Sequence, residues 1–302
     1  MEKNGTTERT YIPVSGIYRI KGSKIITYII LSLWALTTIA PLVWIFINSF
    51  KNNDEIIGGA FSFPREYIEN GTIFQNFQTL KRFSENNIIR GFANSFIISG
   101  SVLLLILVLG SMAAFVLARF KFRFTGYVKA YLVASMLIPQ FAVIVPNFVI
   151  MRNIGLHIPN FQGSHLTVII PQVAGLMNFA ILMLTSFMSG LPKELEEAAL
   201  MDGCSIGKIF TRITVPLTIP AMVSVGIMEF LWSYNDLLTP LVYLSKRNQP
   251  VTVLISQVQS LYSTDYGAMM AAILITVVPV IVMYIVSQEY VIKGLTAGAV
   301  KG

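Results

Sequence analysis

The residue types that usually build chemical sites are few and scattered in this 302-residue sequence. It holds one cysteine, Cys204, which excludes an internal disulfide framework. The two histidines, His157 and His165, stand in one short polar loop, where solvation is enough to explain them. No CxxC pair and no group of His and Cys has the spacing of a structural zinc site. The sequence therefore predicts no metal site, no cofactor and no catalytic residue.

A glycine-lysine segment gives a misleading signal for nucleotide binding. Gly203, Gly207 and Lys208 resemble a phosphate loop, but that motif needs four residues between its glycines and a Ser or Thr after the lysine. Here three residues separate the glycines, and Ile209 follows the lysine. We expect no ATP to bind to this chain, and we expect any ATP hydrolysis to occur on a separate subunit.

Two carboxylates, Glu229 and Asp236, lie inside an otherwise apolar stretch. At the centre of a bilayer, each would cost about 2.5–3.5 kcal/mol. Seven residues separate them, so on one helix they would share a side. One interpretation places Glu229 on the wall of a translocation path, with Tyr234 and Asn235 nearby. The other is a structural hydrogen bond between helices, and both interpretations stay open.

The polar segment Pro192–Pro216 is too long for a simple turn between two apolar stretches. Strong helix formers predict a helix over Lys193–Asp202. Gly203 follows where a helix usually ends in a left-handed residue. A second short helix is expected over Ile206–Ile213, ending before Pro216. The segment thus predicts a helix–turn–helix on one membrane face.

The first of these helices has a side that suits contact with another protein. Helical spacing places Leu195, Ala198, Ala199 and Asp202 together, and the alanines allow close approach. Glu194 and Glu197 occupy another side, available to basic groups. An interfacial helix lying on lipid is the alternative, but the apolar face is weak and the acidic side would meet an anionic leaflet.

These residues must be positioned by membrane-spanning helices. The chain is 54% hydrophobic and only 12% charged, with a mean hydropathy of +0.68, and a soluble domain carries about twice that charge. Prolines within the apolar stretches should kink them. Six stretches are long enough to cross a bilayer, namely Ile25–Ile47, Gly91–Ala118, Ala130–Met151, Leu166–Leu191, Leu217–Leu244 and Tyr266–Gln288. The predicted fold is an all-α, polytopic membrane protein.

The positive charges predict the topology and argue against nucleic-acid binding. The net charge of +7 comes from short loops and forms no continuous stripe. With the N-terminus inside, the inner segments carry 14 of the 22 lysines and arginines, which places both termini in the cytoplasm. The expected division is a cytoplasmic segment 1–24, a membrane domain 25–292 with an outer loop 50–90 of short helices and an inner loop 192–216, and a cytoplasmic tail 293–302.

The inner loop also resembles a known family. Its sequence EAALMDGCSIGKIFTRITVPL is similar to the signature loop in permeases of binding-protein-dependent ATP-binding-cassette importers. In that family the loop is a coupling helix that docks into a groove of the ATPase subunit. The matching positions are Glu197, Ala198, Ala199, Asp202, Gly203, Val215 and Pro216.

Other segments extend the resemblance. Ala114–Phe124, Met136–Leu156 and Trp232–Leu244 look like the carbohydrate-importing branch, and Gly294–Gly302 looks like the tail of its maltose-type second permease. The resemblance implies the type I importer permease fold in a bacterial cell membrane. It also implies a different second permease, two cytoplasmic ATP-binding subunits and an extracytoplasmic solute-binding protein. Tail residues Thr296, Gly298 and Lys301 would then contact the ATPase.

Three other functions are alternatives for this sequence. An ion-coupled secondary transporter would carry more ionisable residues at mid-membrane, together with inverted repeats, and the sequence has neither. A permease for a solute other than sugar stays open, as does a receptor or scaffold with no transport role. The importer permease is the function that the inner loop favours.

Overall fold

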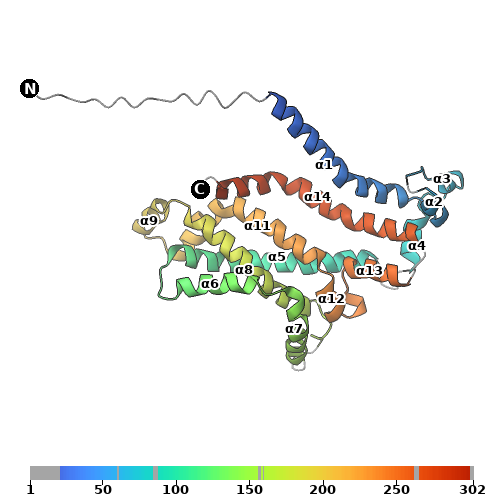
Figure 1. Cartoon of the computed structure of the whole chain (residues 1–302). Helices are drawn as coiled ribbons and strands as arrows, with labels where there is room; N and C mark the ends of the chain where they lie inside the picture. Colours follow the sequence, from blue (N-terminus) through green and yellow to red (C-terminus); the bar gives the residue numbers. More distant parts are fainter. Residues whose placement is uncertain are drawn as a thin grey trace, which may run out of the picture.

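The computed structural model describes residues 21–59, 61–83, 88–155, 158, 160–261 and 265–299, and these form helices and connecting segments without a strand (Figure 1). The all-α fold class is therefore confirmed. In chain order the helices are α1 (Lys21–Asn48), α2 (Asn53–Gly58), α3 (Glu66–Glu69), α4 (Gln75–Phe83), α5 (Ile88–Arg119), α6 (Thr125–Met136), α7 (Gln140–Gly155), α8 (Leu166–Ser189), α9 (Glu194–Met201), α10 (Ile206–Ile209), the π-helical segment η2 (Phe210–Thr214), α11 (Val215–Asn235), α12 (Leu238–Tyr243), the 3-10 turn η3 (Lys246–Asn248), α13 (Val251–Leu261) and α14 (Tyr266–Ala299).

Five helices in the described part of the chain are long and apolar enough to cross a bilayer, and the bent pair α6 and α7 would make a sixth crossing. Four of the predicted spans correspond to single helices: α1, α5, α8 and α14. The last continues beyond Gln288 to Ala299. Pro41, Pro171 and Pro279 lie inside continuous helices.

The predicted span Ala130–Met151 is wrong as a single helix. It divides into α6 and α7, whose axes differ by 102° (Figure 1). Pro139 stands at the break and has no backbone N–H to donate. The chain turns before it through bonds from the Leu137 and Ile138 N–H groups to carbonyls three residues earlier. The proline therefore breaks the predicted span instead of only kinking it.

The predicted span Leu217–Leu244 is also wrong at its outer end. The helix α11 ends at Asn235, and Asp236 has an extended backbone with φ −65° and ψ 121°. The Asp236 carboxylate then accepts a bond of 3.3 Å from the Thr239 N–H, in the first turn of α12. Because Asp236 lies beyond the end of α11, it does not share a helical face with Glu229.

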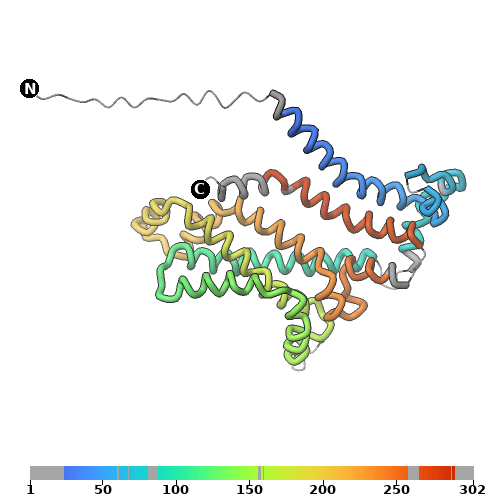
Figure 2. The backbone as a smooth tube through the Cα atoms, in the orientation of Figure 1, coloured from blue at the N-terminus to red at the C-terminus, as the bar shows by residue number. Residues whose placement is uncertain are grey.

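The core of the bundle lies between α5, α8 and α11, which pack against one another (Figure 2). Their contact side chains are mostly branched or small, and α14 covers another side of α11. The buried cluster includes Ile98, Val102, Ile106, Val168, Val173, Leu184, Ala221 and Val225. Many other apolar side chains of these helices remain exposed. A bilayer or a protein partner must cover them.

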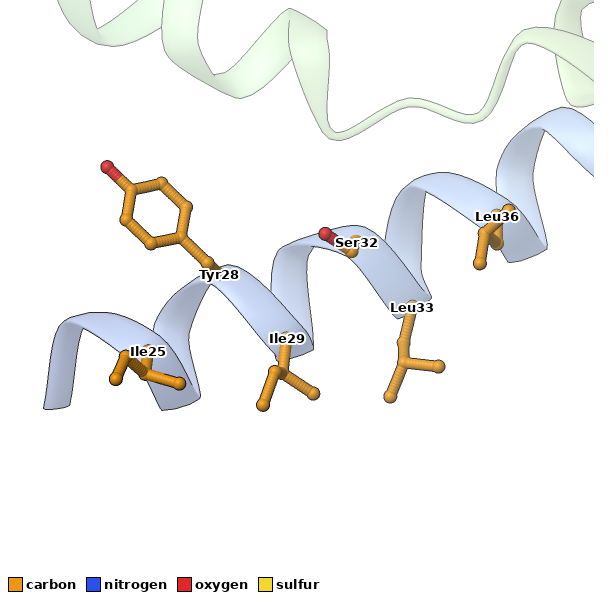
Figure 3. Close-up of a pocket in the computed structure, with 6 residues that line it drawn as sticks. All are labelled: Ile25, Tyr28, Ile29, Ser32, Leu33 and Leu36. Atoms are coloured by element: carbon orange, nitrogen blue, oxygen red, sulfur yellow. The ribbon is translucent and has the colours of Figure 1, made fainter. Parts of the chain in front are cut away.

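The helix α1 is the extreme case of this exposure. Every side chain from Lys24 to Val43 is exposed, and burial begins only near Asn48, where the helix meets the outer segment. Figure 3 shows six of these side chains on the open surface of α1. Figure 1 shows α1 diverging from α14 toward its N-terminal end. The helix therefore suits contact with lipid or with another subunit.

The outer segment 50–90 contains the short helices α2, α3 and α4, at the end of the bundle opposite α9 (Figure 1). Asn76 anchors it by donating to the backbone carbonyls of Ser49 at 2.9 Å and Lys51 at 2.8 Å. The buried Lys51 ammonium donates to the Gly59 carbonyl at 2.9 Å. Gly267, in the first turn of α14, lies directly against this anchor.

Replacing Gly267 with alanine should destabilise the outer segment. The new Cβ would lie 2.5 Å from the Lys51 carbonyl oxygen and 2.6 Å from Asn76 Nδ2, so α14 and the anchor must separate. We expect Gly267→Ala to lower the free energy of unfolding by about 1–3 kcal/mol. The measurement is thermal unfolding in detergent. Gly126→Ala is the control, because nothing lies within 4 Å of its Cβ position; equal stability of the two variants would contradict the prediction.

Candidate functional site

The helix α9 projects from one end of the bundle (Figure 1). None of its eight residues, all of which the structure describes, is buried. Glu194, Ala198 and Met201 lie on its outward side, where Met201 is 88% exposed. Such a short helix gains little stability from its own hydrogen bonds. Its position must therefore come from its two ends and from the side that faces the bundle.

The C-terminal end of α9 is held by the turn at Gly203, whose φ is +80°. The Cys204 N–H donates to the Ala199 carbonyl at 2.9 Å, and the Gly203 N–H donates to the Leu200 carbonyl at 3.0 Å. This pair of bonds is the Schellman motif, which satisfies the last carbonyls of a helix. The predicted helix stop at Gly203 is confirmed. The left-handed backbone there favours glycine, since other residues strain in it.

The expected second helix, Ile206–Ile213 ending before Pro216, is wrong at its C-terminal end. The helix α10 passes through η2 directly into α11, so Ile206–Asn235 is one continuous apolar helix. In η2 the Val215 N–H donates to the Phe210 carbonyl, five residues earlier. This wider turn lies just before Pro216, which stands in the first turn of α11 and has no N–H of its own to donate. The inner loop is thus joined to α11 by a continuous helix.

The structure gathers the five predicted coupling residues on α9 and its C-terminal turn. Glu197, Ala198, Asp202 and Gly203 are exposed, and Ala199 is half-buried. Glu194, Glu196 and Glu197 lie in the first turn, where the helix dipole stabilises negative charge. The result is a small, acidic surface with alanine at its centre, which can fit closely into a cleft that carries basic groups.

One largely buried ion pair beside the predicted coupling residues was not predicted from the sequence. Glu196 faces the bundle, and its Oε2 lies 2.7 Å from Nε of Arg119, at the end of α5. Thr214 of η2 donates to Glu196 Oε1 at 3.0 Å. Glu196 lies three residues before Ala199, which puts both on one helical face, but only the structure shows that this face meets the bundle.

The three residues predicted for a translocation path do not share one surface. Glu229 is fully buried, and neither of its carboxylate oxygens has a hydrogen-bond partner among the described residues. Tyr234 is 1% exposed and stacks on Phe230 with ring centroids 5.7 Å apart. Asn235 is exposed. Of the three, only Asn235 reaches the surface of this chain.

Asp236 joins a polar group that links three helices near the C-terminal end of α11. Gln172 of α8 donates to Asp236 Oδ2 at 2.9 Å, and Gln140 of α7 approaches the same oxygen at 3.4 Å. Ser233 donates to Gln172 Oε1 at 2.7 Å. For Asp236, the structure therefore favours the alternative of hydrogen bonds between helices.

The remaining predicted site residues differ in how far the structure describes them. Thr296 and Gly298 lie in the last turns of α14, and Lys301 lies outside the described residues, as does His157. His165 is half-buried rather than solvated, and its Nε2 lies 3.0 Å from Asn94 Oδ1. The described part of the chain holds no group of three His, Cys, Asp or Glu residues placed to bind a metal.

Comparison with known proteins gives consistent similarities. Residues 106–296 match the family described as binding-protein-dependent transport system inner membrane component. The diacetylchitobiose uptake system permease protein NgcG of Streptomyces coelicolor is 33% identical over 276 residues, which cover 90% of this chain and 87% of the relative. The trehalose/maltose transport system permease protein MalG of Thermococcus litoralis is 28% identical over 272 residues, which cover 89% of this chain and 94% of the relative.

The fold is similar to a chain in the crystal structure of a bacterial ABC transporter involved in the import of the acidic polysaccharide alginate. The TM-score is 0.73 at 20% sequence identity, and the match covers 89% of this chain and 96% of that chain. At this identity the likeness concerns the fold. The family match over residues 106–296 includes α9.

The turn at Gly203 gives a direct test of how α9 is held. Gly203→Ala places a side chain in the left-handed backbone region and should cost about 1–2 kcal/mol of local stability. We therefore expect faster amide exchange over residues 194–204, measured by hydrogen–deuterium exchange. Gly207→Ala is the matched control, because both glycines have open space around them but only Gly203 has a positive φ. Equal protection in the two variants would remove the role assigned to this turn.

Proposed function

The chain belongs to the family of binding-protein-dependent transport system inner membrane components, and from this premise we propose that α9 couples it to a separate ATPase and that its solute is an oligosaccharide. It is a multi-pass membrane subunit of an ATP-driven importer. The single observation that carries the coupling proposal is α9 itself, which has no fully buried residue and is joined through α10 and η2 to the long helix α11.

The ATPase is the proposed partner of the α9 surface. Ala198 leaves room for a groove wall to approach, and the exposed carboxylates of Glu197 and Asp202 can pair with its basic groups. ATP would be hydrolysed on two such cytoplasmic subunits. Their closure would move α9, and the continuous helix Ile206–Asn235 would carry that movement into the membrane as a two-state change.

This proposal also fixes the orientation in the membrane. The α9 end of the bundle would be cytoplasmic, and the outer segment with α2–α4 would face the solute-binding protein. The C-terminal end of α14 lies at the same end of the bundle as α9 (Figure 1), which agrees with a tail, 293–302, that meets the ATPase through Thr296, Gly298 and Lys301. The N-terminal segment 1–24 would be cytoplasmic as well, and 25–292 would form the membrane domain.

The oligosaccharide proposal rests on the relatives and on one exposed surface of the bundle. The names of the two relatives refer to diacetylchitobiose uptake and to trehalose and maltose transport. On α11, Trp232 is 47% exposed and meets Phe179 of α8 edge-on at 5.1 Å, and Asn235 lies nearly one turn further along. An aromatic ring beside an amide offers both an apolar face and polar contacts to a sugar.

We place this surface on the translocation path, enclosed between this chain and a second, different permease. Glu229 and Tyr234 would then form the wall behind it, rather than touch the solute. The exposed helix α1 would lie against that second permease or against lipid. A solute of another class is the second candidate for the same path. The class of solute that raises the ATPase rate separates the two candidates.

The docking proposal is tested by crosslinking in the assembled complex. In a Cys204→Ser background, which removes the native cysteine, we expect Ala198→Cys to form an adduct with the ATPase subunit through a short bifunctional reagent. Ser32→Cys, on the exposed middle of α1, is the control and should give no such adduct. Adducts of Ala198→Cys with lipid alone would overturn the docking proposal.

The solute class is tested with the complex reconstituted in vesicles together with its binding protein. We expect a di- or oligosaccharide to raise the ATPase rate, and amino acids to leave it unchanged. Trp232→Ala should lower sugar uptake about three- to tenfold, because a lost aromatic contact is worth about 0.5–1.5 kcal/mol.

Trp34→Ala is the matched control, because Trp34 is exposed on α1 and lies away from the proposed path. Stimulation by amino acids and not by sugars would favour the second candidate. Equal uptake by the two tryptophan variants would remove Trp232 from the path.

A further inference from the structure

The side of α9 that faces the bundle is tied to it by one charged contact. Arg119 is the last residue of α5, and its Nε lies 2.9 Å from Oε1 and 2.7 Å from Oε2 of Glu196. The two side chains are only 6% and 13% exposed. Charge-assisted bonds at these distances are among the stronger side-chain contacts in proteins. The contact joins residues 77 positions apart in the sequence.

Glu196 also contacts a third element. Thr214, at the end of η2, is fully buried and donates to Glu196 Oε1 at 3.0 Å. Thr214 is joined in turn to α11, since the Thr218 hydroxyl donates to its carbonyl at 2.7 Å. One carboxylate therefore connects α9 with the inner end of α5 and with the base of α11. We call these three residues, Arg119, Glu196 and Thr214, the inner triad.

The surroundings of the inner triad allow movement. The η2 segment is a π turn, and such turns occur often at functional sites within longer helices. Phe210 in this turn packs on Phe115 of α5 with ring centroids 5.2 Å apart, and Phe115 also meets Phe120 at 6.0 Å. The burial of these apolar rings is non-directional, so the contacts tolerate small rotations better than hydrogen bonds do.

Arg119 keeps unused bonding capacity in this arrangement. Its Nη1 and Nη2 atoms are buried, and neither has a hydrogen-bond partner among the described residues. A guanidinium group offers five N–H donors, and here only Nε meets the carboxylate. The two-point, fork-like pairing of an arginine with a carboxylate is therefore not formed. A shift of α9 can convert the present contact into that pairing without moving Arg119 away from Glu196.

We propose that Arg119, Glu196 and Thr214 are positioning residues that pass the movement of α9 to α5 and α11 together. This inference rests on the proposed coupling function and goes beyond it, since it assigns residues that face away from the ATPase. A peptide linkage alone would carry the movement only into α11, through α10 and η2. The inner triad adds α5, which packs against both α8 and α11 in the core. Docking and transmission are thus assigned to opposite sides of one short helix.

The test separates transmission from docking. Glu196→Gln and Arg119→Gln each remove one charge of the pair. Thr214→Val replaces only the hydroxyl, with a methyl group of similar size. Each is measured in the complete complex in vesicles as solute taken up per ATP hydrolysed. We expect this ratio to fall about fivefold or more for the charge variants, within the range of known couplings between sites, and to fall less for Thr214→Val. The adduct from Ala198→Cys to the ATPase should persist in all three.

Arg123→Gln is the matched control, because Arg123 is an exposed arginine four residues after Arg119, and it should leave the ratio unchanged. The exchanged pair Arg119→Glu with Glu196→Arg should recover part of the ratio, limited by the unfavourable charge at the end of α5. If a charge variant does not assemble, the ratios measured for Thr214→Val and Arg119→Lys decide whether the inner triad transmits movement. Arg119→Lys keeps the positive charge but cannot form a two-point pairing with the carboxylate.

An unchanged ratio in the assembled variants would overturn the inner triad. So would a fall in uptake matched by an equal fall in ATP hydrolysis, because that pattern marks a purely structural role. Absence of the Ala198→Cys adduct in the Cys204→Ser background, with the inner triad unchanged, would instead refute the docking proposal. The two failures are therefore distinguishable.

Discussion

Backbone polar groups cannot be left unpaired in the hydrocarbon core of a bilayer, and this constraint underlies the whole structure. It explains why the long apolar stretches of the described chain are helices. It also explains how the helices end where they must. At Pro139 the backbone turns through local bonds three residues apart. After α11 ends, the Asp236 carboxylate accepts the Thr239 N–H, which the first turn of α12 leaves without a helical acceptor.

Many polar side chains inside the bundle follow the same rule, but in the described part of the chain not all of them do. Asp236, Gln172 and Ser233 bond to one another between α8 and α11, so their burial is offset. Glu229 lies one turn before Ser233, on the same side of α11, and its carboxylate has no partner among the described residues. Asp236, whose carboxylate is hydrogen-bonded, thus lies just beyond the end of α11. Glu229, whose carboxylate has no partner among the described residues, lies within α11.

The inner end of the bundle uses local and long-range contacts for different purposes. The Schellman turn at Gly203 defines where α9 ends, and it depends only on neighbouring residues. The pair Arg119–Glu196 defines where α9 lies, and it depends on the packing of α5 beside α11. A helix with no buried residue needs both, because it has no buried apolar side chain to hold it in place. This division leaves its outward side available for a partner.

The sequence alone determined the all-α membrane fold, the number of apolar stretches, the stop at Gly203 and the family. The fold, the apolar stretches and the stop at Gly203 follow from composition, stretch length and local backbone chemistry, which act over a few residues. The family follows from the resemblance of the inner loop. It did not determine that Pro139 breaks a span rather than kinking it, or that η2 carries the inner loop into α11 past Pro216. Nor did it place Glu229 inside the bundle, or Glu196 beside Arg119. Each of those outcomes depends on which distant helix packs alongside, and that competition among contacts is decided only when the whole chain is folded.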